Sequence, residues 1–165
     1  MKILAIDPGY DRLGVAVLEK KEGKKEELLF SECFSPAKNL AKEKRIFEIG
    51  QKINELIKRF SPSELIIEDL FFGKNLKTAL IVAEVRGEII YEASKASIGV
   101  HEFTPSQIKT AVTGNGKSDK SQIAFMVSKL INMNGKKPKF DDENDAIAVG
   151  LTFFAYHGNR LKERA

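Results

Sequence analysis

The stretch KILAIDPG, residues 2–9, decides the fold of this chain, because a short apolar run leads directly into a carboxylate and a turn. The run Lys2–Asp7 has the length and composition of a buried strand. Pro8 and Gly9 then predict a turn. We therefore expect a buried strand with an acidic side chain at its carboxyl end.

Further elements follow on both sides of a helical segment. Residues 14–20 and 26–34 are expected to form two strands joined by a hairpin turn at Gly23-Lys24. Apolar residues recur at helical spacing over residues 40–60, and Ser61-Pro62 stops that helix. The remaining expected elements are a strand at 65–67, a helix at 78–97, a strand at Gly99–Phe103, a helix from Pro105 to Val112 capped by Thr104, a helix at 120–131, and a last helix from Asp141 to about Tyr156.

This order of elements predicts the fold class. Three strands in a meander are followed by strands that alternate with helices, which is typical of an α/β domain with a mixed sheet. We expect a single domain over residues 1–158, built on a five-stranded mixed sheet flanked by helices, and a short charged tail over residues 159–165.

Composition excludes several classes of protein. A chain of 165 residues fits one compact domain. It contains no run of the ~20 apolar residues that a membrane-spanning helix needs, and its first residues do not resemble a signal peptide. Cys33 is the only cysteine, so no intrachain disulfide can form, and a cytoplasmic location without membrane attachment is the expectation.

Positive charge is concentrated in one segment. Residues 104–140 hold seven lysines and one acid, Asp119, and so carry +6, whereas the whole chain carries +4. Such a segment is either a solvated surface or a surface for a polyanion. The second interpretation gains weight only if a catalytic site lies beside it.

Asp7 and Glu68 occupy similar positions, each at the end of an apolar strand. A carboxylate there is desolvated unless a cation or a hydrogen-bond donor meets it. The position of Asp7, taken alone, is also explained if its side chain forms an Asx turn over Pro8-Gly9. The position of Glu68 is also explained if the end of its strand is exposed to solvent. If the two strands are neighbours, however, the carboxylates repel each other, and a divalent cation would relieve the repulsion.

Asp142 and Asp145 add a pair of carboxylates spaced i, i+3 on the last helix. Acids at a helix N-terminus are often explained by capping and by the helix dipole. Asp145 fits that explanation less well, because the small residues Ala146, Ala148 and Gly150 follow it and favour an inward face. Four carboxylates without a set of histidines or cysteines favour magnesium or manganese over zinc. Two such ions ~3.5–4 Å apart suit phosphodiester hydrolysis.

The same residues resemble a known family. The segments that carry the resemblance are residues 3–9, 67–75, 83–87, 120–122 and 142–148. In this order and spacing they resemble the RuvC Holliday junction resolvases, from Met1 to about Gly158. The resemblance implies a ribonuclease-H-like fold and a homodimer that binds four-way junction DNA and makes paired, symmetric nicks in recombination and repair.

The resemblance also implies roles for individual residues. Asp7, Glu68, Asp142 and Asp145 align with the family's catalytic, metal-binding carboxylates, for two Mg²⁺ ions that Mn²⁺ can replace. Some relatives carry histidine at the position of Asp142. Asp141 is the alternative residue for this aligned position, and Asp142 is preferred because its spacing to Asp145 fits the motif.

For DNA binding, Phe71 aligns with an aromatic residue of the family that stacks on an opened base. Phe72 could take this stacking role instead, and either phenylalanine could be a residue of the hydrophobic core. Lys109 and Lys120 align with lysines near the scissile phosphate, and Lys74 and Lys117 are further DNA-binding candidates.

Partners follow from the same resemblance. The helix expected from Thr78 is apolar over a wide arc, and in the family this helix forms the dimer interface; simple burial under neighbouring helices is the alternative. A branch-migration helicase complex is the other implied partner.

Two rival functions remain open, and a third does not fit the length of the chain. Another ribonuclease-H-like nuclease acting on RNA or single strands would share the carboxylates, and a silent junction-binding protein would share the DNA surface. A sugar-kinase-like nucleotide binder needs two large lobes, for which 165 residues do not suffice. The segment Gly114–Ser118 resembles the end of a phosphate-binding loop, but the earlier glycine is replaced by Ala111, and no strand precedes it.

Overall fold

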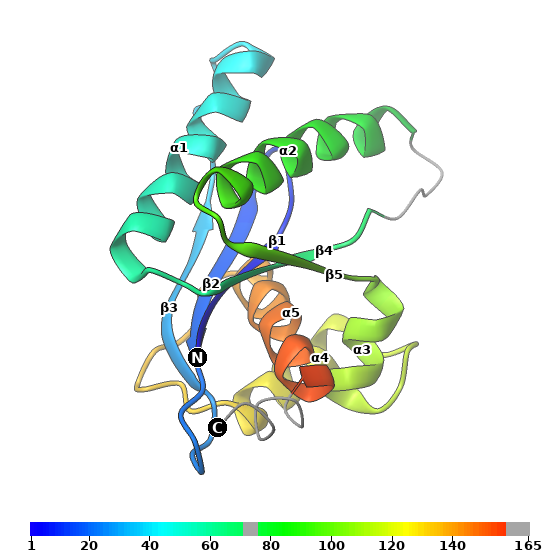
Figure 1. The fold of residues 1–165 in the computed structure, drawn as a ribbon. Helices are drawn as coiled ribbons and strands as arrows, with labels where there is room; N and C mark the ends of the chain where they lie inside the picture. Colours follow the sequence, from blue (N-terminus) through cyan, green and yellow to red (C-terminus); the bar gives the residue numbers. More distant parts are fainter. Residues whose placement is uncertain (71–75, 158–165) are drawn as a thin grey trace.

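Strand β1 lies in the middle of a five-stranded sheet, and this position organises the whole domain (Figure 1). The computed structural model describes residues 1–70 and 76–157. The sheet order is β3-β2-β1-β4-β5, formed by β1 (Lys2–Asp7), β2 (Leu13–Glu19), β3 (Glu27–Phe34), β4 (Glu64–Glu68) and β5 (Gly99–Phe103). The pairs β1–β2 and β2–β3 are antiparallel, whereas β1–β4 and β4–β5 are parallel. The expected mixed sheet is confirmed.

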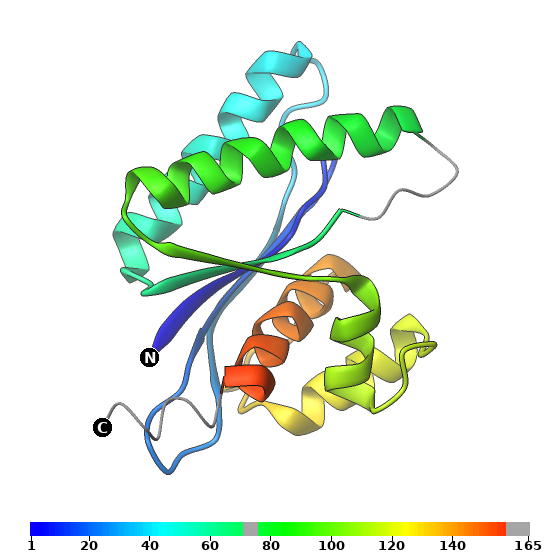
Figure 2. The same cartoon turned by 45° about the vertical axis from the view of Figure 1, so that its right-hand side comes forward.

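Helices cover both faces of the sheet (Figure 2). They are α1 (Lys42–Phe60), α2 (Leu76–Lys95), α3 (Pro105–Thr113), α4 (Lys120–Leu130) and α5 (Asp141–His157). Helices α1 and α2 lie on one face, and α5 crosses the other face with α3 and α4 beside it. Within the described residues, none of these helices is long and apolar enough to span a bilayer.

The two faces of β1 are buried in different cores. Ile3 and Ala5 belong to the core under α5, whereas Leu4 and Ile6 belong to the core under α1 and α2. Alternation of side chains along a strand produces this division. All four side chains are fully buried, which explains why the sequence of β1 is apolar throughout.

Small residues allow α5 to approach the sheet closely. Ala146 and Ala148 are fully buried, and a Cβ on Gly150 would lie 3.0 Å from the Leu18 side chain. A Cβ on Gly14 of β2 would lie 2.1 Å from the main-chain oxygen of Asp142, so the first turn of α5 rests directly on β2. The inward face expected from the small residues of this helix is confirmed.

The boundaries expected from the sequence agree closely with the structure. Thr104 accepts a hydrogen bond from the Gln107 amide in a capping box, as the Thr104-Pro105 pair predicts. The largest difference is in α2, which begins at Leu76 rather than at residue 78 and ends two residues before 97. The tail expected at residues 159–165 lies outside the described residues.

Candidate metal and nucleic-acid site

The sheet brings Asp7 and Glu68 to the same edge. Ile6 of β1 is paired with Ile67 of the parallel strand β4, and each acid is the next residue along its strand. Because parallel strands end at the same edge, the two carboxyl groups lie beside each other. The adjacency on which the metal hypothesis depended is therefore present.

Helix α5 brings the other two acids to this edge. Asp7 is paired with Gly14 in the β1–β2 ladder, and the main chain of Asp142 rests on that glycine. Asp145 follows one turn later on the same helix. The four expected carboxylates thus converge from three elements, β1, β4 and α5, although they are far apart in the sequence.

The electrostatics of the four acids show how crowded the site is. Burial, followed by the charges of Glu68, Asp145 and Asp142, raises the pKa of Asp7 from 3.8 to about 8. Burial is also the largest cause of the raised pKa of Glu68, followed by the charge of Asp145. Burial raises the pKa of Asp145 as well, against the lowering effect of Lys120. Bringing these carboxylates together is unfavourable without a cation, which is the property expected of a metal site.

Two basic side chains neutralise part of this charge. The ammonium of Lys120 lies 3.0 Å from Asp145 Oδ2, and the guanidinium of Arg12 forms an ion pair with Asp142. Within residues 1–70 and 76–157, no three His, Cys, Asp or Glu side chains are already arranged around one point as metal ligands. The donor set nevertheless consists of oxygen atoms only and carries excess negative charge, so it fits a hard divalent cation once these cationic side chains move away.

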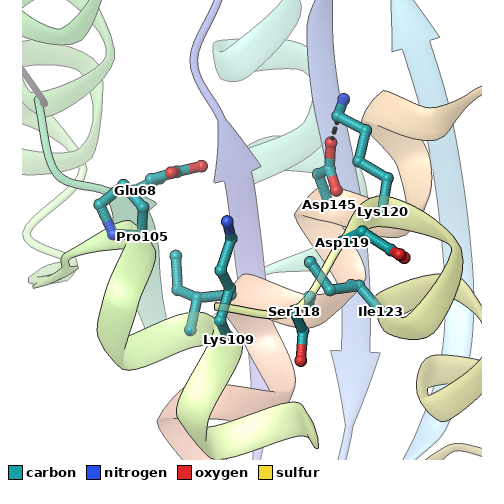
Figure 3. Close-up of a pocket in the computed structure, with 10 residues that line it drawn as sticks. Glu68, Pro105, Lys109, Ser118, Asp119, Lys120, Ile123 and Asp145 are labelled. Carbon is teal, nitrogen blue, oxygen red and sulfur yellow. Dashed lines mark hydrogen bonds and ion pairs between the residues drawn. The ribbon is translucent and has the colours of Figure 1, made fainter. Parts of the chain in front are cut away.

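A cavity of about 470 Å³ opens beside the carboxylates (Figure 3). Glu68 and Asp145 lie on two of its sides, and Lys109 rises from α3 between them. Lys120 reaches across from the start of α4 to Asp145. Two of the expected DNA-binding lysines therefore line the same cavity as two of the expected metal ligands.

The other expected DNA-binding residues have different positions. Lys117 is exposed in the connection between α3 and α4 and does not line this cavity. Phe71, its rival Phe72 and Lys74 lie outside the described residues.

Arg86 lies in the segment 83–87 that carries the family resemblance, but no role was predicted for it. Its side chain is buried on α2, where the guanidinium donates to the main-chain oxygen of Glu68 and pairs with Glu102 of β5. It also lies 3.5 Å from Asp69 Oδ1. The signal was available, because an arginine inside the apolar arc of a helix has to find a partner when it is buried.

Helix α2 leaves part of its apolar surface uncovered. Val85 and Ile89 are fully buried, as simple packing against the sheet requires. Leu76 and Leu80 are 64% and 63% exposed, so burial under neighbouring helices does not account for the whole apolar arc.

Comparison with known proteins identifies close relatives. Residues 3–153 match the family described as Crossover junction endodeoxyribonuclease RuvC. The chain is 42% identical to the crossover junction endodeoxyribonuclease RuvC of Carboxydothermus hydrogenoformans over 98% of this chain and 100% of the relative. It is 44% identical to the protein of the same name from Thermosipho melanesiensis, over 90% of this chain and 94% of the relative.

A solved structure supports the same likeness. The structure of Thermus thermophilus RuvC in complex with a Holliday junction substrate matches with a TM-score of 0.86 and 29% identity, and the match covers 94% of each chain. The five-stranded mixed sheet with its flanking helices therefore has the ribonuclease-H-like architecture that the family resemblance implied.

Proposed function

The chain belongs to the RuvC family of crossover junction endodeoxyribonucleases, and from this premise we propose that it resolves four-way DNA junctions by metal-dependent phosphodiester hydrolysis. The observation that carries the proposal is the convergence of Asp7, Glu68, Asp142 and Asp145 at one edge of the sheet, next to a cavity lined by lysines. A negative cluster beside a positive wall suits a nuclease, because a metal binds the acids and the lysines attract phosphate.

We propose that the four carboxylates hold two Mg²⁺ ions, which Mn²⁺ can replace. The ions would activate the attacking water and stabilise the leaving oxygen. Asp7 and Glu68 belong to strands and are fixed by the sheet, whereas Asp142 and Asp145 are carried by the first turns of α5. Asp141 is exposed next to this set and is the less suitable ligand.

The lysines of the cavity have a second role in this proposal. Lys120 neutralises Asp145 in the absence of metal and would move to a phosphate oxygen of the cut strand when the site is loaded. Lys109, in the same cavity, would contact the adjacent phosphate. Such contacts hold the DNA in register without reading its sequence. Phe71, Lys74 and Lys117 remain candidates for contacts nearer the centre of the junction.

Paired nicks require two active sites, and we propose a homodimer formed through α2. Exposed Leu76 and Leu80 supply the apolar surface, which a second copy would cover. A two-fold dimer would set two carboxylate clusters against a junction of similar symmetry. A branch-migration helicase partner and a cytoplasmic location stay predictions.

The test is nicking of a synthetic four-way junction in Mg²⁺, compared with a matched linear duplex. We expect paired nicks in the junction only, and we expect Asp7→Asn to abolish cutting while junction binding is retained. Junction binding without cutting, across Mg²⁺, Mn²⁺ and several core sequences, would instead identify a silent binding protein. Unchanged cutting by Asp7→Asn would remove Asp7 from the catalytic set.

The lysines that line the cavity, Lys109 and Lys120, have a separate test. Lys120→Ala should weaken junction binding and reduce the slope of log K against log salt concentration by about 0.9, the value for one phosphate contact. Lys58→Ala is the matched control, because Lys58 is exposed near the end of α1, and that end contacts Lys2 at the start of β1, away from Asp7. An unaltered slope for Lys120→Ala would show that this lysine does not contact phosphate.

A further inference from the structure

A second concave surface lies next to the edge strand β3, away from the cavity of Lys109 and Lys120. It has a volume of about 440 Å³, and we call it the β3 groove. One wall is formed by Ser31 and Cys33 of β3, and the other by Lys136, Lys137, Lys139 and Phe140 of the connection between α4 and α5. Its lysines belong to the basic segment of residues 104–140, but none of them was assigned an individual role from the sequence.

The connection that carries these lysines is held in place at its start. The amide of Leu28 donates to the main-chain oxygen of Asn132 at 2.9 Å. The amide of Asn132 donates to the main-chain oxygen of Glu26 at 2.8 Å. The Asn134 side chain donates to the oxygen of Leu28 at 3.3 Å. The start of the connection is therefore attached to β3 by a single parallel bridge between Asn132 and Glu27.

Glu143 fixes the other end of the connection. Its Oε1 accepts hydrogen bonds from the amides of Lys139 at 2.9 Å and Phe140 at 3.3 Å, and its Oε2 accepts one from the Ser31 hydroxyl at 2.6 Å. The lysine side chains thus project from a main chain that is bonded to β3 and α5 rather than from a free loop.

The exposed charge of the groove is positive. Two acids line it, but Glu143 is only 6% exposed and is engaged by the three donors just described, while Glu32 pairs with Lys52 at 2.7 Å. In the part of the chain that the structure describes, no carboxylate forms an ion pair with Lys136, Lys137 or Lys139, and all three are exposed. Three unpaired ammonium groups within four residues form a surface suited to a polyanion.

The β3 groove is continuous with the carboxylate site through Arg12. The guanidinium carbon lies 4.9 Å from the centre of the Phe140 ring, and Nε donates to Cys33 Sγ at 3.4 Å. Both of those residues line the groove, while the other end of the guanidinium pairs with Asp142. An anion held in the groove would therefore reach the edge of the metal site.

We propose that the β3 groove is a second binding surface for the DNA backbone and holds a duplex arm of the junction as it leaves the carboxylates. In the strand order, β3 lies on one side of β1 and β4 on the other, so Asp7 stands between this groove and the cavity that contains Lys109. Arg12 contacts Phe140 and Cys33 of the groove and would add a fourth cation to it if Asp142 were engaged by a metal. This inference rests on the proposed function, because the occupant is the junction itself.

The test is the salt dependence of junction binding by the full-length protein, measured without divalent metal so that nothing is cut. The variant replaces Lys136, Lys137 and Lys139 by alanine. The control replaces Lys24, Lys58 and Lys95, which are also exposed but do not line the groove. We expect the groove variant to reduce the slope of log K against log salt concentration by about 2–3, since each phosphate contact contributes about 0.9.

A second readout separates binding from catalysis. At saturating junction in Mg²⁺, the groove variant should cut at nearly the wild-type rate, because it leaves the carboxylates and Lys120 in place. A slope equal to that of the control variant would overturn the proposal, as would a lost cutting rate with unchanged binding. Failure of the wild-type protein to bind or cut the junction would refute the proposed function instead, so the two failures are distinguishable.

Discussion

Replacing Asp7 by asparagine is expected to stabilise the protein in the absence of metal, although it removes a metal ligand. The pKa of Asp7 is raised from 3.8 to about 8, chiefly by burial and then by the charges of Glu68 and Asp145. Between these pH values the unfolded chain has released a proton that the folded chain retains, so the free energy of unfolding falls as pH rises. Asparagine carries no charge and escapes this loss.

The magnitude follows from the same pKa. At 1.36 kcal/mol per pH unit, the interval from 3.8 to pH 7 corresponds to an upper limit of about 4 kcal/mol. Rearrangement of the neighbouring carboxylates in the wild type reduces this value, and we expect Asp7→Asn to gain about 2 kcal/mol at pH 7. For a chain of 165 residues that gain raises Tm by about 4–8 °C.

Thermal unfolding in a chelator, at pH values from 4 to 8, measures the effect. The difference in Tm between Asp7→Asn and the wild type should be small near pH 4, where the folded Asp7 is protonated and the unfolded Asp7 is only partly ionised, and should grow up to about pH 8. Added Mn²⁺ should raise the Tm of the wild type and leave that of the variant nearly unchanged. Glu22→Gln, which alters an exposed acid in the β2–β3 turn, is the control and should show neither effect.

Two results would refute this reasoning. If the variant in chelator is no more stable than the wild type at pH 8, Asp7 does not experience the burial and repulsion that the structure indicates. If Mn²⁺ stabilises the variant as much as the wild type, Asp7 is not required for metal binding.

Three further perturbations test other parts of the site. Gly14→Ala would place a Cβ 2.1 Å from the main-chain oxygen of Asp142, so we expect a loss of about 1–3 kcal/mol in chemical denaturation, and weaker Mn²⁺ binding by calorimetry. Arg86→Ala removes the donor to the Glu68 main chain and should lower the free energy of unfolding by about 2–3 kcal/mol. The folded variant should require more Mg²⁺ for half-maximal cutting. An unchanged Mg²⁺ requirement would limit this arginine to a structural role. Leu80→Glu should convert the expected dimer to a monomer in light scattering, and a wild type that is already monomeric would contradict the α2 interface.

Much of the fold was predictable because local patterns and tertiary packing agree. The apolar run before Asp7 and the Thr104-Pro105 cap each specify an element, and both elements occur where the sequence places them. Glu68 was recognisable for the same reason, as an acid at the end of a strand. The sequence did not predict that Glu68 lies beside Asp7, because this requires β1 and β4 to be neighbours. The order of strands depends on how the helices cross the sheet.

The parts that sequence reasoning missed depend on long-range packing. Arg12 pairs with Asp142 although 130 positions separate them, and nothing in the segment after Gly9 indicates that its side chain turns toward α5. The lysines at 136, 137 and 139 were counted as charge, but the groove that they line depends on long-range contacts. Asn132 and Asn134 attach the start of the connection to β3, and Glu143 fixes its end. A charge count gives the sign of a surface and not its shape.

The central position of β1 has a consequence for the exchange of amide hydrogens. Its amides are hydrogen-bonded within a sheet that has neighbours on both sides, and both of its faces are fully buried. Such amides exchange with solvent only when the whole domain opens, whereas amides at helix ends exchange through local fraying. Removing metal should therefore accelerate exchange in the first turn of α5, which carries Asp142, and leave the amides before Asp7 as slow as global unfolding allows.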